Sequence, residues 1–346
     1  MRVLIIKTSS LGDVLHALPA LTDAARALPQ VRFDWLVEES YAEIPAWHPA
    51  VDTVIPVALR RWRSGITSPQ HRQEWMRALH ALRMRRYDRI IDAQGLLKSA
   101  VLAACARGQR HGLGFTSARE PLAALFYGHR HAVPRGRHAV ERLRTLFALA
   151  LDYALPHDTI DYGISPAPIS ATDLRGTYVV FLHGTAWTTK QYPEPYWIAL
   201  AGLANAAGLR VLLPAGSPAE AERAHRIAAS TADARVLPAM TLTGLAGVLS
   251  GARGVVGVDT GLAHCAAALS VPAVTIYGAT DPGLTGTLGR AQHHARAEFS
   301  CSPCLRRRCH FHGASAVVPA CYETVSPPQV WALLTQLMDG TQEVAR

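Results

Sequence analysis

Three short segments hold side chains that could carry out chemistry, and each follows a strand-like run. The first is Lys7-Thr8-Ser9-Ser10-Leu11-Gly12-Asp13, a turn of small residues that leads into a helix. Backbone N–H groups at a helix start favour anions, and a carboxylate there can act as a base or cap the helix. Position alone favours Asp13 as the cap of a helix beginning at Val14 over a catalytic role.

The second segment is Val258-Asp259-Thr260-Gly261-Leu262-Ala263-His264, again a strand, a tight turn and a helix. Gly261 permits close backbone approach, and the helix start favours an anion. A carboxylate at such a place suits a ligand that carries both hydroxyls and phosphates. A sugar attached to a diphosphate has both, so Asp259 and His264 are candidates for binding it. An ordinary strand-to-helix turn capped by aspartate is the structural alternative.

The third segment, His183–Lys190, offers hydroxyls and a lysine after another strand. Only three of the 35 basic residues are lysines, namely Lys7, Lys98 and Lys190. We therefore expect Lys190 to neutralise a phosphate. The structural alternative is an ordinary polar loop. The chain contains no D-x-D pair, which a sugar transferase that uses Mg²⁺ would place near the phosphates. This absence indicates that protein groups themselves stabilise a leaving diphosphate.

Basic residues are concentrated in the first half of the chain. The net charge is +9, and most of it lies in residues 1–165. This excess predicts an acidic partner: a phosphorylated or carboxylated substrate, a membrane surface or nucleic acid, unless it is simply a solvated basic face. Aromatic residues are sparse among the cations and no nucleic-acid motif is present, so we expect no nucleic acid. The candidates for binding an anion are Arg60, Arg61, Arg63, Lys98 and Arg119.

Four of the six cysteines form the pattern C-x2-C-x4-C-x11-C at residues 301, 304, 309 and 321. Such spacing is compatible with a metal site or a disulfide. The neighbouring Arg306–Arg308 run would crowd a cation, and free thiols are expected in a reducing cytosol. We expect no metal, with the state of the four cysteines left open.

The elements that position these segments alternate between strand and helix, which predicts an α/β fold with parallel sheets. Neither G-x-G-x-x-G nor a P-loop is present, which argues against a nicotinamide enzyme. In the first half we expect strands at 3–6, 33–38, 53–57 and 89–92, and helices at 14–27, 73–82, 98–106 and 139–153. In the second half we expect strands at 178–182, 210–214, 235–237, 254–258 and 273–277, and helices at 195–207, 218–230, 243–249, 262–269 and 328–338.

The Pro- and Ser-rich stretch 165–172 is typical of an interdomain linker. Two open parallel sheets would bind ligands at the carboxyl ends of their strands, and two such domains can face each other across one cleft. That geometry suits a reaction between two substrates. No signal peptide or membrane span is evident, so a cytoplasmic location is expected.

Several stretches of the sequence resemble the lipopolysaccharide heptosyltransferase I family. They are KTSSLGDVLHALPAL at the start, FDWLVEE, IPVALRRWR, YDRIIDAQGLLKSA and VDTGLAH. The resemblance runs across nearly the whole chain. It implies the GT-B fold, with an acceptor-binding Rossmann-like domain at 1–165, a donor-binding one at 173–326 and a C-terminal helix at 327–346 that crosses back to the first domain.

The resemblance also implies an activity. It is the inverting, metal-independent transfer of heptose from ADP-heptose to Kdo of Kdo2-lipid A, by a protein at the cytoplasmic face of the inner membrane. The family's catalytic base falls on Asp13. Its donor-site residues fall on Thr185, Lys190, Glu220, Met240, Asp259, Thr260, Gly261 and His264. Ala186 stands where the family often has a second threonine.

Two other interpretations remain open. Heptosyltransferase II, which adds the next heptose, is the nearer one, because the cysteine cluster is similar to that type. A non-catalytic module that binds a nucleotide or an anionic lipid through the basic first domain belongs to a different class.

Overall fold

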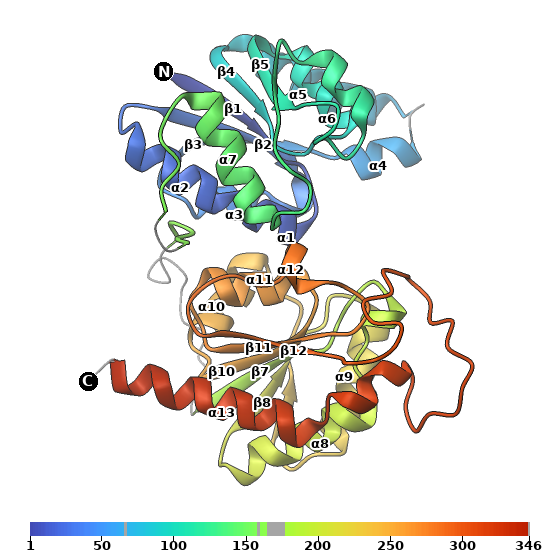
Figure 1. The fold of residues 1–346 in the computed structure, drawn as a ribbon. Coiled ribbons are helices and arrows are strands. Elements are labelled where there is room, and N and C mark those ends of the chain that lie inside the picture. Colours follow the sequence, from blue (N-terminus) through green and yellow to red (C-terminus); the bar gives the residue numbers. More distant parts are fainter. Residues whose placement is uncertain (66–67, 158–159, 165–176, 345–346) are drawn as a thin grey trace. The chain divides into compact units, whose positions relative to one another are not determined.

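The computed structural model describes residues 1–65, 68–157, 160–164 and 177–344 (Figure 1). The chain divides into two units, Met1–Ile164 and Ser165–Arg346. The expected linker at 165–172 lies outside the described residues. Each unit is built around one parallel sheet and is described by itself.

The first unit contains a six-stranded sheet in the order β3-β2-β1-β4-β5-β6, and all its strand pairs are parallel. This is the doubly wound order, which reverses between β1 and β4. β1 reads RVLII and is almost wholly buried, as expected for a central strand covered on both faces. The strands are β1 (Arg2–Ile6), β2 (Arg32–Glu38), β3 (Val51–Val57), β4 (Arg86–Asp92), β5 (Arg107–Leu113) and β6 (His129–His131).

Helices cover both faces of this sheet (Figure 1). α2 packs against α7, and α5 packs against α6. The α-helices are α1 (Leu11–Leu15), α2 (Leu18–Ala27), α3 (Glu43–Ala46), α4 (Leu59–Ser64), α5 (Pro69–Met84), α6 (Leu97–Cys105) and α7 (Ala139–Leu151). Two 3₁₀ turns, η1 (Glu39–Tyr41) and η2 (Pro121–Phe126), complete the unit.

The second unit repeats this architecture. Its sheet has the order β12-β11-β10-β7-β8-β9, again parallel throughout, with the reversal between β7 and β10. The strands are β7 (Tyr178–Leu182), β8 (Arg210–Leu213), β9 (Ala234–Val236), β10 (Gly254–Val258), β11 (Ala273–Tyr277) and β12 (Gln292–Arg296). The two sheets confirm the α/β class and the pair of doubly wound domains that constitute the GT-B fold.

In the second unit α8, α9 and α13 pack together on one side of the sheet, and α10 packs against α11 on the other (Figure 1). The α-helices are α8 (Glu194–Ala206), α9 (Pro218–Ala229), α10 (Leu242–Ser250), α11 (Gly261–Ala268), α12 (Pro282–Thr285) and α13 (Pro327–Val344), with 3₁₀ turns η3 (Thr188–Lys190) and η4 (Ala320–Thr324). α13 contacts α8, β10, β11 and β12.

Most of the expected elements occur at the expected residues. The differences are one divided helix, three further strands and the unexpected short helices α3, α4 and α12. The single helix expected over 14–27 is divided into α1 and α2, because Pro19 lies in the first turn of α2, a position where its missing N–H costs nothing. β5, β6 and β12 were not expected, because sequences such as HRH and QHHAR lack the β-branched residues of typical strands.

Candidate functional site

Each unit places two of its candidate segments where the strand order reverses. In open parallel sheets this reversal opens a crevice at the carboxyl ends of the strands, and ligands bind there. Lys7 directly follows β1, and Ala93 directly follows β4. In the second unit His183 follows β7, and Asp259 follows β10. The topology alone therefore gives each unit one candidate binding edge.

At the edge of the first unit a buried lysine lies beside an exposed carboxylate. Lys7 Nζ donates to the carbonyl oxygen of Ala93 at 3.0 Å and lies 4.0 Å from Asp13 Oδ1. The side chain of Asp13 is 45% exposed, whereas that of Lys7 is buried. Burial lowers the pKa of Lys7, and the charge of Asp13 opposes this effect. The carboxylate of Asp13 is thus accessible to a ligand, and the ammonium group of Lys7 lies near its Oδ1.

The local role of Asp13 differs from the one expected from position. The helix begins at Leu11 with Ser10 as its N-cap, so Asp13 is the third helical residue and not the cap. Its Oδ2 accepts hydrogen bonds from the Ser10 amide at 2.9 Å and the Ser10 hydroxyl at 2.7 Å. This is a capping box, which holds the carboxylate in place. Oδ1 is the oxygen that faces Lys7.

At the edge of the second unit, Asp259 is the centre of a polar cluster. Its Oδ2 lies 2.6 Å from Lys190 Nζ and accepts a hydrogen bond from the Thr280 hydroxyl, also at 2.6 Å. His264 Nε2 lies 3.9 Å from Oδ1. Lys190 and Asp259 are largely buried, at 17% and 9% side-chain exposure, so their charges are only weakly screened by water. Thr280 was missed by the sequence reasoning, since it follows a different strand.

The remaining donor candidates surround this cluster. The Thr185 hydroxyl points to the carbonyl oxygen of Asp259 at 3.5 Å. Thr260 is the N-cap of α11 and Gly261 its first residue, without a side-chain cap bond at that helix start. Glu220 accepts from the Gly216 amide at 2.8 Å.

The Glu220 carboxylate lies close to Gly184, which follows β7. A Cβ atom at Gly184 would lie 2.5 Å from Glu220 Oε1, so a larger residue there would displace this carboxylate. Met240 lies just before α10, next to Gly244. The structure thus brings Glu220 to the residues that follow β7.

The acceptor candidates form two groups. Arg60, Arg61 and Arg63 belong to α4, which follows the edge strand β3. Lys98 lies in α6, which follows β4, and Arg119 precedes η2. Because β2 and β1 separate β3 from β4 in the sheet, the five cations do not form one cluster.

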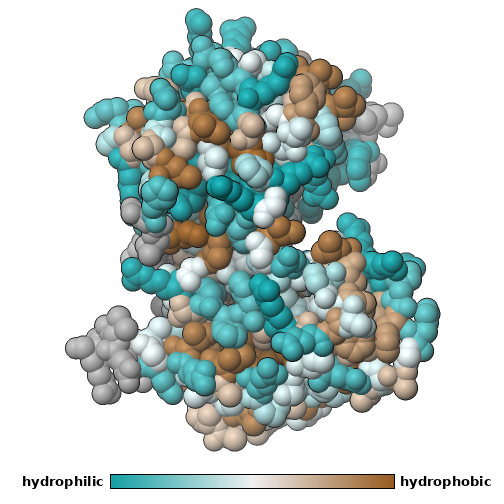
Figure 2. All heavy atoms as spheres, viewed as in Figure 1, coloured by the Kyte–Doolittle hydropathy of each residue, from teal (hydrophilic) through white to brown (hydrophobic). Residues whose placement is uncertain are grey.

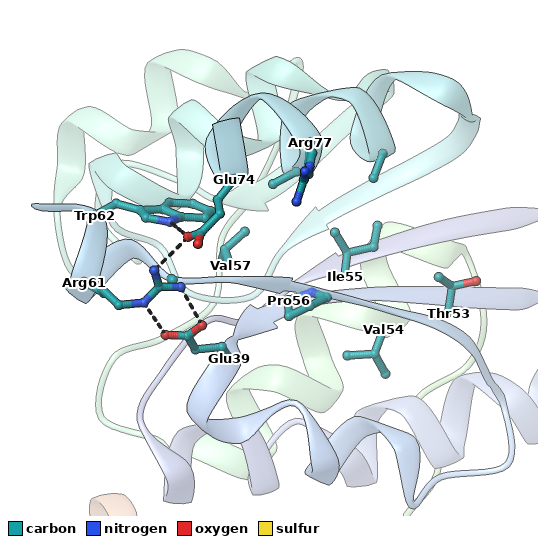
Figure 3. Close-up of a pocket in the computed structure, with 13 residues that line it drawn as sticks. Glu39, Thr53, Val54, Ile55, Pro56, Val57, Arg61, Trp62, Glu74 and Arg77 are labelled. Atoms are coloured by element: carbon teal, nitrogen blue, oxygen red, sulfur yellow. Dashed lines mark hydrogen bonds and ion pairs between the residues drawn. The ribbon is translucent and has the colours of Figure 1, made fainter. Parts of the chain in front are cut away.

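Arg61 is held by two carboxylates (Figure 3). Its Nε and one terminal nitrogen donate to Glu39 at 3.1 and 3.0 Å, and the other terminal nitrogen donates to Glu74 at 2.8 Å. Glu74 also accepts from the Trp62 indole at 2.8 Å. These residues border a cavity of about 400 Å³ beside β3 and α5. Arg60 instead lies over the Tyr41 ring, 5.7 Å from its centroid.

Lys98 lies among exposed apolar side chains of α6 and η2. Leu97 and Val101 are 38% and 43% exposed, and Leu122 and Leu125 are 58% and 61% exposed. Figure 2 shows hydrophobic surface on the first unit where Figure 1 labels α6. α6 and η2 pack against each other, so these side chains form an apolar surface next to a cation.

All six cysteines are free thiols, and Cys301, Cys304, Cys309 and Cys321 lie in the long segment between β12 and α13. Burial, together with the three neighbouring thiols, raises the pKa of Cys321 to about 12. Within the described residues, no group of three or more His, Cys, Asp or Glu side chains has an arrangement that could hold a metal ion. In the same residues, no helix combines the length and the apolar character that a membrane span requires.

Comparison with known proteins identifies relatives along the whole chain. The profile of glycosyltransferase family 9 (heptosyltransferase) matches residues 75–315. Lipopolysaccharide heptosyltransferase 1 of Pseudomonas aeruginosa is 50% identical over 348 residues, which cover 98% of each chain.

Two solved structures have the same fold. The Escherichia coli heptosyltransferase WaaC with ADP is 51% identical, with a TM-score of 0.82 over 86% of this chain and 93% of its own. The same enzyme with ADP-2-deoxy-2-fluoro heptose is 44% identical, with a TM-score of 0.83 over 97% of this chain and 99% of its own.

Proposed function

This chain belongs to glycosyltransferase family 9, the heptosyltransferases, and from that premise we propose that it transfers heptose from ADP-heptose to the Kdo of Kdo2-lipid A. The observation that carries the proposal is the 50% identity to a lipopolysaccharide heptosyltransferase 1 over 98% of both chains, because it includes both units. The first unit would bind the acceptor and the second the sugar nucleotide. The domain limits expected at 165, 173 and 327 belong to the same proposal.

The donor would bind at the carboxyl edge of the second sheet. Complexes of a relative with ADP and with a fluorinated ADP-heptose support this ligand. The diphosphate would lie against Lys190 and the backbone at Thr260 and Gly261, where a helix begins. Asp259 and His264 would hold heptose hydroxyls, with Thr185 beside the phosphates. Glu220 would bind the ribose, and Met240 would lie near the adenine.

Transfer would occur by a single displacement that inverts the anomeric centre. Asp13 would take the proton from the attacking Kdo hydroxyl as its oxygen bonds to the anomeric carbon of heptose. The bond from that carbon to the diphosphate oxygen breaks in the same step, and ADP leaves with the electron pair. The exposure of Asp13 and the hydrogen bonds that fix its Oδ2 suit this role, since Oδ1 stays directed towards Lys7.

The leaving ADP needs a positive environment, and we propose that protein groups provide it without a metal ion. Lys190 supplies a cation and the α11 start supplies backbone N–H groups. An oxocarbenium-like transition state is expected by analogy with glycoside hydrolysis.

The acceptor is an anionic glycolipid, and the cations of the first unit would meet it. Arg60, Arg61 and Arg63 on α4 and Lys98 and Arg119 near η2 would bind its carboxylates and phosphates. Leu97, Val101, Leu122 and Leu125 would contact the bilayer that holds the lipid, which supports a peripheral position on the cytoplasmic face of the inner membrane.

The test is to incubate the protein with ADP-heptose and Kdo2-lipid A and to measure ADP release. We expect release that depends on both substrates, with one heptose added to the acceptor by mass. A parallel reaction uses the same acceptor already carrying one heptose. Faster release with this second acceptor would overturn the choice of acceptor, and binding of both substrates without release would overturn the proposed activity.

A further inference from the structure

One indole ring in the second unit contacts two cations. Lys190 Nζ lies 4.7 Å from the centroid of Trp187, and Arg307 Cζ lies 5.5 Å from the same centroid. Both distances are typical of cation–π contacts. Lys190 and Trp187 share one loop, whereas Arg307 comes from the cysteine-containing segment between β12 and α13. The ring therefore joins a distant arginine to the proposed diphosphate site.

Hydrogen bonds fix the backbone that carries Arg307. The hydroxyls of Thr188 and Thr189 donate to the carbonyl oxygens of Arg307 at 2.9 Å and Arg306 at 2.5 Å. The Leu305 amide donates to the carbonyl oxygen of Ala279 at 2.8 Å. Segment 305–307 is thus attached to the residues that follow both β7 and β11, at the carboxyl edge of the sheet.

The two cations on the Trp187 ring differ in their ion pairs. Lys190 is paired with Asp259 at 2.6 Å. Within the part of the chain that the structure describes, no carboxylate lies within 4.0 Å of the Arg307 guanidinium. Two cations contact one ring, and one carboxylate neutralises one of them. An anionic ligand would supply the missing charge.

We propose that Arg307 binds the diphosphate of the sugar nucleotide as a further donor-binding residue. The assignment rests on the proposed function and deepens it. A guanidinium presents a planar fork of N–H donors that matches two phosphate oxygens, which a lysine cannot do. Ala186 has no hydroxyl that could donate to a phosphate. Arg307 would supply a phosphate contact in place of the one that a threonine could make at position 186. Lys190 and Arg307 both contact the Trp187 ring. This shared contact would place the two cations at neighbouring phosphate oxygens.

The test compares the binding of ADP and AMP by isothermal titration calorimetry to the full-length protein. The variants are Arg307→Ala and Arg307→Lys, with Arg308→Ala as a matched control that removes the same charge one residue later. For Arg307→Ala we expect ADP binding to weaken about tenfold and AMP binding to change less than about twofold, because only ADP carries the second phosphate. Arg307→Lys should lie between Arg307→Ala and the unchanged protein.

Three outcomes would overturn the assignment. They are unchanged ADP binding in Arg307→Ala, equal weakening of ADP and AMP, and an equal effect of Arg308→Ala. Equal weakening of both nucleotides would identify Arg307 as a residue that only holds the loop. If the unchanged protein binds no ADP, the proposed function fails as well, whereas the three outcomes above leave it standing.

Discussion

Asp13 Oδ1 lies 4.0 Å from the ammonium group of Lys7, while its other oxygen accepts both hydrogen bonds of Ser10. The two oxygens of one carboxylate therefore have different partners. Oδ2 belongs to the helix start, and Oδ1 faces a buried cation at the edge of the sheet. A residue that only capped a helix would have no need of the second partner.

Replacing Asp13 by asparagine should separate these two roles. Loss of a general base should lower turnover roughly a thousandfold, while ADP binding should stay unchanged because the proposed ADP site lies in the second unit. Ser10→Ala is the control: it removes a capping partner, should cost about 1 kcal/mol of stability and should leave turnover close to normal. ADP release, calorimetry with ADP and thermal unfolding measure these effects. Near-normal turnover of Asp13→Asn would rule out the role of Asp13 as general base, and only its role in capping the helix would remain.

Substitutions of the two partners of the Lys190–Asp259 pair should have different effects on nucleotide binding. Lys190→Ala should weaken ADP binding about tenfold, because a charge-assisted contact to phosphate is lost. Asp259→Asn should leave ADP binding intact or tighter, since it removes a negative charge beside the diphosphate, yet raise the KM for ADP-heptose. Calorimetry with ADP and initial rates decide between these effects. A purely structural ion pair would give the same change in both variants.

Glu39 and Glu74 should compete with the acceptor for Arg61. All three side chains are partly exposed, so a phosphate can displace the carboxylates without a large cost of desolvation. We expect Glu39→Gln to lower the KM for the acceptor and Arg61→Ala to raise it. Arg226→Ala, which breaks a surface pair with Glu194 in the second unit, is the matched control. An unchanged KM in Glu39→Gln would remove Arg61 from the acceptor site.

His48 should make the protein less stable in acid. Its Nδ1 accepts from the Ala50 amide and its Nε2 contacts the Thr22 hydroxyl, both at 3.1 Å, so the neutral ring satisfies both partners. Burial is the main cause that lowers the pKa of His48 to about 4. The nearby Asp161 raises this pKa, and Arg26 lowers it.

The sign of this effect follows from proton binding. Between pH 6.5 and about 4 the unfolded chain binds a proton at His48 that the folded chain does not. The contribution of neutral His48 to the free energy of unfolding is on the order of 3 kcal/mol. It is complete above pH 6.5 and is lost as the pH falls towards 4. Thermal unfolding at pH 7.5 and 4.5 should show a smaller loss for His48→Gln than for the unchanged protein. Equal losses would contradict this account.

Chelation should not affect the reaction. If Lys190 and the start of α11 stabilise the leaving diphosphate, treatment with EDTA followed by gel filtration should leave turnover unchanged, and added Mg²⁺ should not raise it. The measurement is the rate of ADP release before and after treatment. Activity that is lost with the chelator and restored by a divalent cation would refute metal-independent transfer.

The sequence predicts the scaffold well where apolar runs are long. β7, β10 and β11 begin and end at the expected residues, because fully buried strands leave little choice of residue type. The scarcity of lysine also pointed to Lys7 and Lys190, and the structure places each beside an aspartate at a strand-order reversal. Their involvement in binding and catalysis stays a prediction.

Contacts between distant parts of the chain could not be predicted in this way. Thr280 and Arg307 reach the Asp259 cluster and the Trp187 ring from segments that follow other strands, and no local pattern encodes such a meeting. In the sequence, the Arg306–Arg308 run indicates only that a cation would be crowded there. In the same way, the charge pattern offered Arg61 as a free cation, whereas folding brings Glu39 and Glu74 to it.

The attachment of Thr188 and Thr189 to Arg307 and Arg306 spans 119 and 117 residues of sequence. This spacing has a consequence for synthesis on the ribosome, where domains fold as their residues emerge. The first sheet can be completed as soon as His131 has left the ribosome. The loop that carries Lys190 emerges much earlier than the segment that fixes it. If this loop binds the nucleotide as proposed, a nascent chain would complete its nucleotide site only when its synthesis is almost finished.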